Sequence, residues 1–417
     1  MTIYQISDQF LSFYKSNDAE ILKSAPLIHP LFPMSFNMSA GLVQLDPLLR
    51  SNEKILNKKM VVIQKCFRHF DLNKVTDSSH LSFFEMGGYF EVGNFNKQNS
   101  MELIFNLLVE EYQIDPAKLW ITYFSGDDIY GHEFSKDEEI LAVWKKLLPN
   151  KNQIVGFGKE YNFWTQGGGA EISIESKLCG SQTEIFFDLG ENECKEKPCL
   201  PNCKCGRFLE ISNNLFITHK ITGELKIVSL LNKAVESVIG IERVCVVTEN
   251  KSNVYDIGEL TSLSRLLRTD SEKTFENTLR KNRIADHIRA LCFLIPEGAP
   301  LPGRNGRARI IRTLIREMLT DLYVLKLKSA EKINQLILQV VSVYQHRYPE
   351  LTGKETKISE FILDHERIYM KTLTKAGAVI RRHLIKTNKK TLDRQEADYF
   401  RKQFGIPVEL QERYINL

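Results

Sequence analysis

The spacing of hydrophobic and polar positions changes near residue 250. Before that point, short apolar runs separated by turn residues predict β-strands. The strand-like runs are MVVIQKCFRHF (60–70), SHLSFFEMGGYFE (79–91), TEIFFDL (183–189), RFLEISNNLFITHK (207–220), VESVIG (235–240) and IERVCVV (241–247). Two helices interrupt them, at 6–16 and 100–112. In the second, Ser100 is the predicted cap, and Leu103, Leu107 and Leu108 form one face.

After residue 250 apolar residues recur at intervals of three and four, which predicts helices over 274–295, 308–327 and 333–348. The pattern therefore predicts an α+β chain with two domains. Residues 1–249 would form an antiparallel β-sheet flanked by helices, and residues 250–417 an all-helical domain.

Length and composition agree with a globular protein of more than one domain. The 417 residues are 43% hydrophobic and 26% charged, too apolar for a disordered chain. A net charge of +4 does not by itself argue for a nucleic-acid partner. The opening residues MTIYQISDQFLSFYKS do not resemble a secretion signal, and no run is long and apolar enough for a membrane span. We therefore expect a soluble, cytoplasmic protein.

Four of the eight cysteines lie in the short segment CKEKPCLPNCKCG, within a predicted insertion over 191–206. They are Cys194, Cys199, Cys203 and Cys205. Such spacing suits four thiolates around one structural zinc ion, because a short turn-rich loop has few apolar groups to order itself. The alternative is a flexible cysteine-rich insertion without metal. The other four cysteines are scattered singly, as reduced thiols usually are.

Two arginines stand where a nucleotide site would need them. Arg68 follows an apolar strand of a predicted hairpin, and Phe83 and Glu85 lie on the second strand. Arg243 follows Gly240, which permits a tight turn. An arginine fork binds phosphate oxygens bidentately, and an aromatic ring beside it can stack on a purine. On a hairpin, however, such residues are more often surface charge and core.

The order of several segments resembles that of alanyl-tRNA synthetases along almost the whole chain. SHLSFFEMGGYFEVGNF resembles the second motif of class II synthetases in that family. The segments that follow in the family's order are NFW (162–164), CGSQTEIFFDLG (179–190), RFLEISNNLF (207–216), GIERV (240–244), NRIADHIRALCFLIPEGAPLPGRNGRARIIRTLIRE (282–317) and FGIPVEL (404–410). The resemblance ends where the family's editing domain would begin, and the sequence contains no His-x-x-x-His pair for that domain's metal.

The resemblance implies a class II antiparallel sheet that binds ATP with Mg²⁺ and forms an aminoacyl adenylate. Carried over by position, Arg68 would hold the α-phosphate and the amino-acid carboxylate. Phe83 would stack on adenine, Glu85 would fix the adenine end or its hairpin, and Arg243 would bind the γ-phosphate. The residues that handle ATP therefore match the family.

The residues that would bind the amino acid depart from the family. A segment that usually reads Asp-Thr-Gly reads Glu236, Ser237 and Val238 here. Glutamate keeps the charge that binds the substrate ammonium but moves it by about one methylene, and valine fills space left by glycine. A methylene in such a pocket changes discrimination by about 1–3 kcal/mol.

Further substitutions surround the same expected pocket. Trp164 and Asn213 match the family, whereas Ser212 replaces a usual tryptophan and Thr218 a usual glutamine. Several changes around one small pocket indicate that it has been reshaped. The sequence predicts that the protein activates a small amino acid, without naming which one.

Two positions expected to read the acceptor also differ. By alignment, the family's asparagine and aspartate for the acceptor stem fall on Arg304 and Lys402, with Asn305 as the alternative to Arg304. Cations can hold phosphates but do not reproduce base recognition by a short amide or carboxylate. The sequence therefore favours amino-acid activation with transfer to an acceptor other than tRNA-Ala, such as a carrier protein or small molecule. The alternatives are an alanine–tRNA ligase without editing and a non-catalytic binding or regulatory protein.

Overall fold

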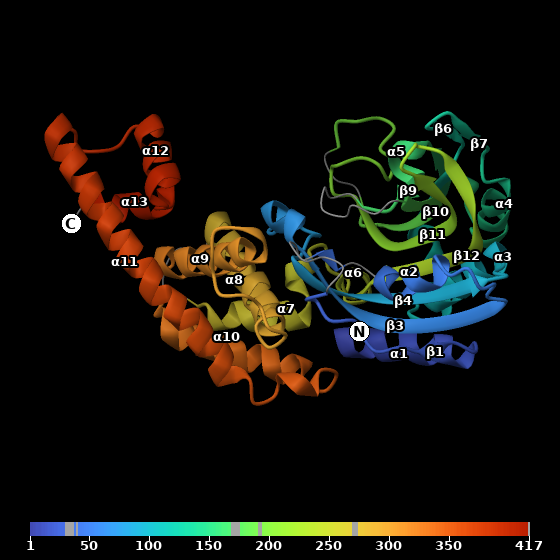
Figure 1. Ribbon diagram of the computed structural model, residues 1–417, viewed down its shortest axis with the longest axis horizontal. Helices are drawn as coiled ribbons and strands as arrows, with labels where there is room; N and C mark the ends of the chain where they lie inside the picture. The colour runs from blue at the N-terminus through green and yellow to red at the C-terminus, as the bar shows by residue number, and fades with distance from the viewer. Residues whose placement is uncertain (30–36, 39–40, 168–175, 191–193, 269–273, 416–417) are drawn as a thin grey trace. The chain divides into compact units, whose positions relative to one another are not determined.

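The computed structural model of the protein describes all but six short segments of the chain (Figure 1), namely residues 30–36, 39–40, 168–175, 191–193, 269–273 and 416–417. The chain divides into two compact units. The first contains Met1–Arg68, Asp77–His80 and Phe84–Gly258. The second contains His69–Thr76, Leu81–Phe83 and Glu259–Leu417, so it includes short pieces of the β3–β4 connection.

A mixed sheet forms the centre of the first unit, with the strand order β1-β3-β4-β12-β11-β10-β5-β8. Its strands are β1 (Glu20–Ile21), β3 (Asn57–Arg68), β4 (Phe83–Gly93), β5 (Leu119–Phe124), β8 (Ile154–Phe157), β10 (Ser176–Asp188), β11 (Phe208–Thr222) and β12 (Ile227–Gly240). The short strands β2 (Asn37–Met38) and β9 (Phe163–Thr165) pair with β3 and β10, and β6 (Asp127–Ile129) pairs with β7 (His132–Phe134). Neighbours from β4 to β5 are antiparallel, as predicted, whereas β1 with β3 and β5 with β8 are parallel. The α+β prediction is confirmed, with parallel pairs added toward the edges.

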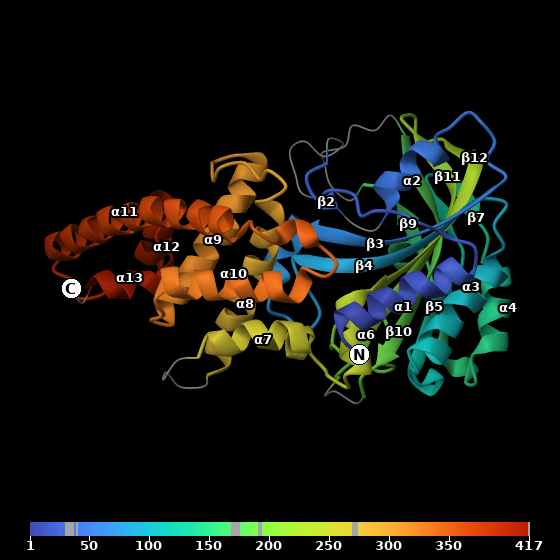
Figure 2. The same ribbon diagram turned by 90° about the horizontal axis from the view of Figure 1, so that it is seen from below.

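Helices cover both faces of this sheet (Figure 2). They are α1 (Ile3–Ser16), α2 (Leu42–Leu49), α3 (Lys97–Asn106), α4 (Glu138–Leu147), α5 (Lys159–Asn162) and α6 (Ile241–Thr248). Tyr14 of α1 stacks on Tyr89 at a centroid distance of 4.3 Å, and Leu45 and Leu49 of α2 share a core cluster with Phe90. Successive strand residues point to opposite faces. Helices α1 and α2 therefore lie on opposite faces of the sheet.

The structure corrects two local predictions. IERVCVV forms helix α6 instead of a strand, and Ile241, Val244 and Cys245 make a buried face at helical spacing. A short apolar run does not distinguish a strand from a buried helix, so only packing decided this segment. Helix α3 begins earlier than predicted, because the side chain of Asn96 accepts from the Asn99 N–H. Ser100 is instead buried in the first turn and donates to the Asn96 carbonyl.

The second unit is helical, as the periodicity predicted. Its helices are α7 (Gly258–Leu266), α8 (Phe275–Leu294), α9 (Gly306–Val324), α10 (Ser329–Tyr344), α11 (Glu355–Thr387), α12 (Arg394–Phe404) and α13 (Val408–Ile415). Short 3₁₀ segments occur in both units, at His69–Lys74 and Pro349–Leu351 in the second and at Pro116–Lys118, Lys151–Gln153 and Val254–Asp256 in the first, which also contains a π-helical turn at Leu107–Glu111. None of the described helices is long and apolar enough to cross a membrane.

A buried polar network holds residues 81–83 in the second unit. The backbone N–H and hydroxyl of Ser82 donate to Asp286 of α8 at 2.7 and 2.5 Å. The ring of His287 bonds to Asp286 and Glu317 at 3.0 and 3.1 Å. Burial lowers the pKa of His287, but these two carboxylates outweigh it and raise the pKa to about 9. The next residue, Phe83, stacks on Phe293 at 4.2 Å.

Replacing Asp321 with alanine should destabilise the second unit strongly. Asp321 on α9 is fully buried and accepts from Arg280 at 2.9 Å and from Arg283 through two bonds of 2.7 Å. Removing one partner of a buried ion pair costs about 3–5 kcal/mol, because the remaining charges stay desolvated. Urea unfolding followed by helical circular dichroism measures the loss.

The matched control for this substitution is Asp398→Ala. Asp398 bonds to Arg401 at 2.6 Å, but both side chains are about half exposed. An exposed ion pair contributes about 0–1 kcal/mol. Similar unfolding midpoints for the two variants would contradict a stabilising role for the Asp321 network.

Candidate active site

A row of side chains crosses the sheet on the face that carries Phe90. Val238 on β12 is the cross-strand partner of Gly88 on β4 and of Asn213 on β11. Asn213 is in turn the partner of Glu184 on β10. Directly opposed residues of antiparallel strands project from the same face. The register therefore brings these positions into one continuous site across four strands.

Glu236 lies on this face, two residues before Val238. It is opposed by Leu215 and Phe90, and only 2% of its surface is exposed. Burial raises its pKa to about 8, although the positive charge of Arg68 acts in the opposite direction. No hydrogen-bond partner of its Oε1 atom lies in the described part of the chain. A buried carboxyl with an oxygen left without a hydrogen bond gains from a cation that enters beside it, because the cation stabilises the ionised form.

Val238 fills part of the sheet face on which Glu236 projects. Its side chain is 4% exposed and lies between the positions of Asn213 and Gly88. A Cβ atom on Gly88 would stand 2.7 Å from the Cζ of Phe90, which is closer than real Cβ contacts allow. Valine therefore occupies space on the face where Glu236 projects, next to a glycine whose replacement would require the ring of Phe90 to move.

Arg68 ends β3 and lies over the ring of Phe84, 5.1 Å from its centroid. The ring beside Arg68 is therefore Phe84 and not Phe83, and the expected stacking of Phe83 on adenine stays a prediction. Phe83 is fully buried and stacks on Phe293, while Phe84 is half-buried and shares the face of Gly88 and Phe90. Successive residues of a strand point to opposite faces of the sheet, so only one of these two neighbouring phenylalanines can lie beside Arg68.

Glu85 also faces away from this row, because it alternates with Phe84 along β4. It is fully buried, and its backbone N–H donates to Glu242 of α6 at 3.0 Å. This bond uses the backbone of residue 85, so both roles expected for the Glu85 side chain stay predictions.

Arg243 projects from the first turn of α6 toward β11. Its Nη1 donates to the carboxylate of Glu210 at 3.1 Å and to the Glu210 carbonyl at 3.0 Å. A register shift between Ile185 and Phe186 pairs Phe186 with Glu210, although Ile185 pairs with Ser212. This bulge turns Glu210 onto the face of Asn213, because Phe186 and Glu184 alternate with Ile185. The arginine and its acidic partner thus lie at one end of the row.

Glu184 is the second acidic group at this end. Burial raises its pKa well above the usual value, and the nearby charge of Glu210 raises it further. The hydrogen bond with Thr122 and the positive charge of Arg243 lower the pKa and are outweighed. Asn213 Nδ2 and Gln182 Nε2 donate to its Oε1 at 3.2 and 3.1 Å. Two carboxylates that disfavour each other's ionisation form a site that could hold a divalent cation with oxygen ligands.

Sequence reasoning missed both of these carboxylates. The signal was available, since each acid interrupts an apolar strand run, in TEIFFDL and RFLEISNN. For Glu210, however, the strict period of two would place its side chain with Ser212 on the other face. Only the bulge, which the sequence does not reveal, brings Glu210 to Arg243.

The structure separates the residues predicted around the amino acid. Trp164 on β9 packs against the cluster that includes Leu215 and Phe90, so it lies on the face of Glu236. Asn213 lies on that face too. Ser212 does not: its hydroxyl accepts from Asn214 Nδ2 at 3.3 Å on the opposite face, where its cross-strand partner is Ile239. The presence of Ser212, where the family usually has tryptophan, therefore does not directly change the shape of the face that carries Glu236.

The two predicted acceptor positions both lie in the second unit and are exposed. Arg304 immediately precedes Asn305, which is the N-terminal cap position of α9. Lys402 lies in the last turn of α12 and bonds to Asp398 at 2.5 Å. Nothing in these contacts assigns either side chain to a ligand.

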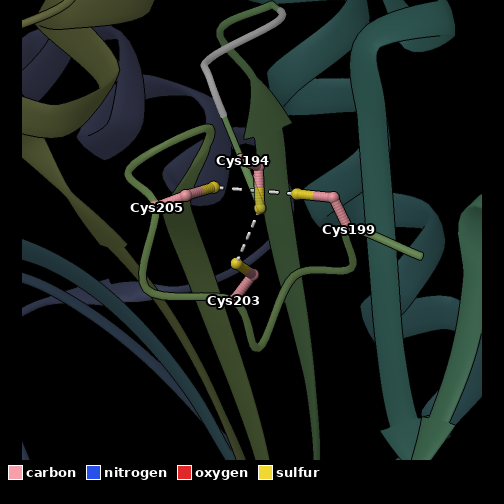
Figure 3. A group of neighbouring side chains, drawn as sticks. All are labelled: Cys194, Cys199, Cys203 and Cys205. Carbon is pink, nitrogen blue, oxygen red and sulfur yellow. Dashed lines mark hydrogen bonds between the residues drawn. The ribbon is translucent and has the colours of Figure 1, made fainter. Parts of the chain in front are cut away.

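The four cysteines of the predicted insertion converge (Figure 3). Their sulfur atoms all lie within 4.8 Å of one another, so the group could hold a metal ion. The predicted insertion began at residue 191, but residues 191–193 lie outside the described part of the chain.

Known protein families and curated relatives identify the family of this chain. The family model for tRNA synthetases class II (A) matches residues 5–416. The chain belongs to this class II synthetase family. Its sequence is 32% identical over 413 residues to an alanine–tRNA ligase of Elusimicrobium minutum, an alignment that covers 97% of this chain and 45% of the relative. An alanine–tRNA ligase of Borreliella afzelii is 29% identical, with coverage of 99% and 68%.

These relatives confirm the predicted resemblance to alanyl-tRNA synthetases. The class II chain spans about half the length of the first curated relatives it matches. Among solved structures, it matches apo histidyl-tRNA synthetase of S. aureus with a TM-score of 0.36 and 13% identity, over 69% of this chain and 75% of that one.

Proposed function

We propose that this class II synthetase activates an amino acid with ATP and forms an enzyme-bound aminoacyl adenylate. The observation that carries the proposal is the single face on which Arg68, Glu236 and Glu210 project, with Arg243 bonded to Glu210. This arrangement offers cations for phosphate and carboxylate groups and a buried anion for an ammonium group, within one row of strands.

The reaction follows from the charges in that row. The substrate ammonium would bind beside Glu236, whose ionisation the new ion pair favours. A carboxylate oxygen of the amino acid attacks the α-phosphorus of ATP, the bond to the bridging oxygen breaks, and pyrophosphate leaves. Arg68 would neutralise the α-phosphate and the attacking carboxylate, and the ring of Phe84 beside it would stack on adenine.

The leaving group would be held at the other end of the row. Arg243 would bind the terminal phosphate of ATP, and Glu184 and Glu210 would hold Mg²⁺, which supplies positive charge to the departing pyrophosphate. Glu210 would exchange part of its contact with Arg243 for this ion. Catalysis in this scheme is positioning and charge neutralisation, with no protein nucleophile.

The amino acid would be small, and its choice would be set by Glu236 and Val238. Val238 reduces the space beside Gly88, while Glu236 projects deep between Phe90 and Leu215. A side chain of the substrate that extends toward Val238 would overlap it, because this part of the sheet is close-packed.

Amino-acid-dependent exchange between ATP and pyrophosphate tests the activation step without any acceptor. We expect exchange with one or a few small amino acids, and none with Arg243→Ala. A protein that binds ATP but exchanges with no standard amino acid would contradict activation of these substrates and favour a binding or regulatory role.

The acceptor gives two candidate functions. Transfer to a carrier protein or small molecule agrees with the cations Arg304 and Lys402 at the positions expected to read an acceptor stem. Charging of tRNA agrees with the curated relatives, which are alanine–tRNA ligases. Attachment of the activated amino acid to total tRNA, measured as acid-precipitable label, separates them, because only the second predicts a charged RNA.

A further inference from the structure

The four sulfur atoms of Cys194, Cys199, Cys203 and Cys205 have the spacing of ligands to one ion. Cys194 and Cys203 are 3.4 Å apart at their sulfurs, Cys199 and Cys205 are 3.6 Å apart, and all four lie within 4.8 Å of one another. Figure 3 shows the four side chains pointing from different parts of one loop toward a common centre. Zinc–sulfur bonds of about 2.3 Å in a tetrahedron place the sulfurs roughly 3.8 Å apart.

Other uses of four cysteines fit this arrangement less well. A disulfide requires sulfurs about 2.05 Å apart and joins them in pairs, so it does not require all four to meet. An iron–sulfur cluster inserts several iron and sulfide ions between its thiolates and separates them further. A compact set of four thiolates is typical of a single tetrahedral ion.

The surrounding loop has few apolar side chains with which to order itself. Residues 194–206 contain Leu200 as their one large aliphatic side chain, and the four cysteines are all half-buried. Where the loop meets β11, Arg207 forms a bidentate pair with Asp188 at 2.8 and 2.6 Å. This pair closes the base of the β10–β11 connection, and Glu210 follows three residues later.

We propose that Cys194, Cys199, Cys203 and Cys205 bind one Zn²⁺ ion in a closed structural site that fixes the β10–β11 connection. With four protein thiolates the ion has no open position for substrate, so it takes no part in chemistry. Its role is to replace the apolar core that the loop lacks. The site goes beyond the proposed amino-acid activation and does not depend on it.

Metal analysis of the purified native chain tests the proposal first. We expect one equivalent of zinc per chain, retained on dialysis, and release of that zinc when about four thiols are titrated with a mercurial reagent. Reconstitution with Co²⁺ should give the charge-transfer and d–d absorption of a tetrahedral thiolate site. Iron instead of zinc, or a folded protein that neither contains nor takes up metal, would overturn the assignment.

Variants of the loop separate metal binding from a general effect on folding. Cys203→Ser should lose the zinc equivalent and make the 194–206 loop sensitive to limited proteolysis. Lys204→Ser, at the neighbouring exposed position, should retain the metal and the resistance. If Cys203→Ser does not fold, the Co²⁺ spectrum and thiol titration of the native protein still decide the question. Equal zinc content in both variants would contradict the proposal.

Discussion

Replacing Arg68 with alanine is expected to reduce amino-acid-dependent ATP–pyrophosphate exchange by about 100- to 1,000-fold. Removing one preorganised group that stabilises transition-state charge has this effect in other enzymes. Arg68 lies over Phe84, and its charge acts on Glu236. The substitution therefore removes the proposed α-phosphate contact and also favours the protonated form of Glu236. Initial rates of exchange at saturating ATP and varied amino acid measure both effects.

Lys58→Ala is the matched control for Arg68→Ala. Lys58 lies on the same strand but is exposed, and its ammonium is 3.9 Å from Glu20. It should exchange at the native rate. Unchanged activity in a folded Arg68→Ala variant would contradict the proposed role of Arg68. It would favour the alternative of a non-catalytic binding or regulatory protein.

Replacing Glu236 with glutamine is expected to lower activity and raise stability together. The pKa of Glu236 is raised to about 8 by burial, against a value near 4.5 in the unfolded chain. Between these values the folded protein holds a proton that the unfolded protein has released. The free energy of unfolding of the native protein therefore falls as pH rises, by about 1.4 kcal/mol per pH unit from this group.

The variant lacks this dependence, so its stability advantage should widen from about pH 5 to pH 8 and then level off. Thermal unfolding across this range measures the difference. A parallel pH dependence of native protein and Glu236→Gln would contradict the raised pKa. The Glu91→Gln variant serves as the control for activity, because Glu91 lies on the neighbouring strand but on the opposite face, with a bond from Tyr89 at 3.2 Å. Burial raises the pKa of Glu91 as well, so this variant is not a control for the pH dependence of stability.

The activity of Glu236→Gln should fall, although its stability should rise. Glutamine cannot provide the negative charge for the substrate ammonium, so kcat/KM for the amino acid should fall by about 100-fold, within the 2–5 kcal/mol of a broken buried charge pair. In the native enzyme kcat/KM should increase as pH rises toward 8, because ionised Glu236 binds the ammonium. That rise should disappear in Glu236→Gln and persist in Glu91→Gln.

The sequence specified some features of this fold and candidate site, and the tertiary structure specified the others. Periodicity predicted three helices of the second unit, α8, α9 and α10, and α9 and α10 bury residues at spacings of three and four. Strand runs determined β3, β4, β10 and β11 in outline. The segment order determined the family, because the residues of a catalytic site recur at fixed places along the chain. The cysteine spacing predicted a common site for four thiols before their geometry was known.

Tertiary structure decided which neighbouring residue faces the site. Phe83 and Phe84 have the same chemistry in the sequence, but the strand turns Phe84 to Arg68 and buries Phe83 against Phe293. A one-residue shift moves a strand side chain to the other face, so local composition does not settle it. The same alternation takes Ser212 away from the face of Glu236.

Long-range packing decided the rest. IERVCVV became helix α6 because its buried face matched helical spacing, although its β-branched residues favour strands. The bulge in β11 brought Glu210 to Arg243, and the burial of Glu236 between Phe90 and Leu215 raised its pKa. The sequence by itself thus determined the main strands and helices, the family and part of the candidate site. Register, bulge and burial, which arise only when distant strands pair, decided which of those residues face one another and with what charge.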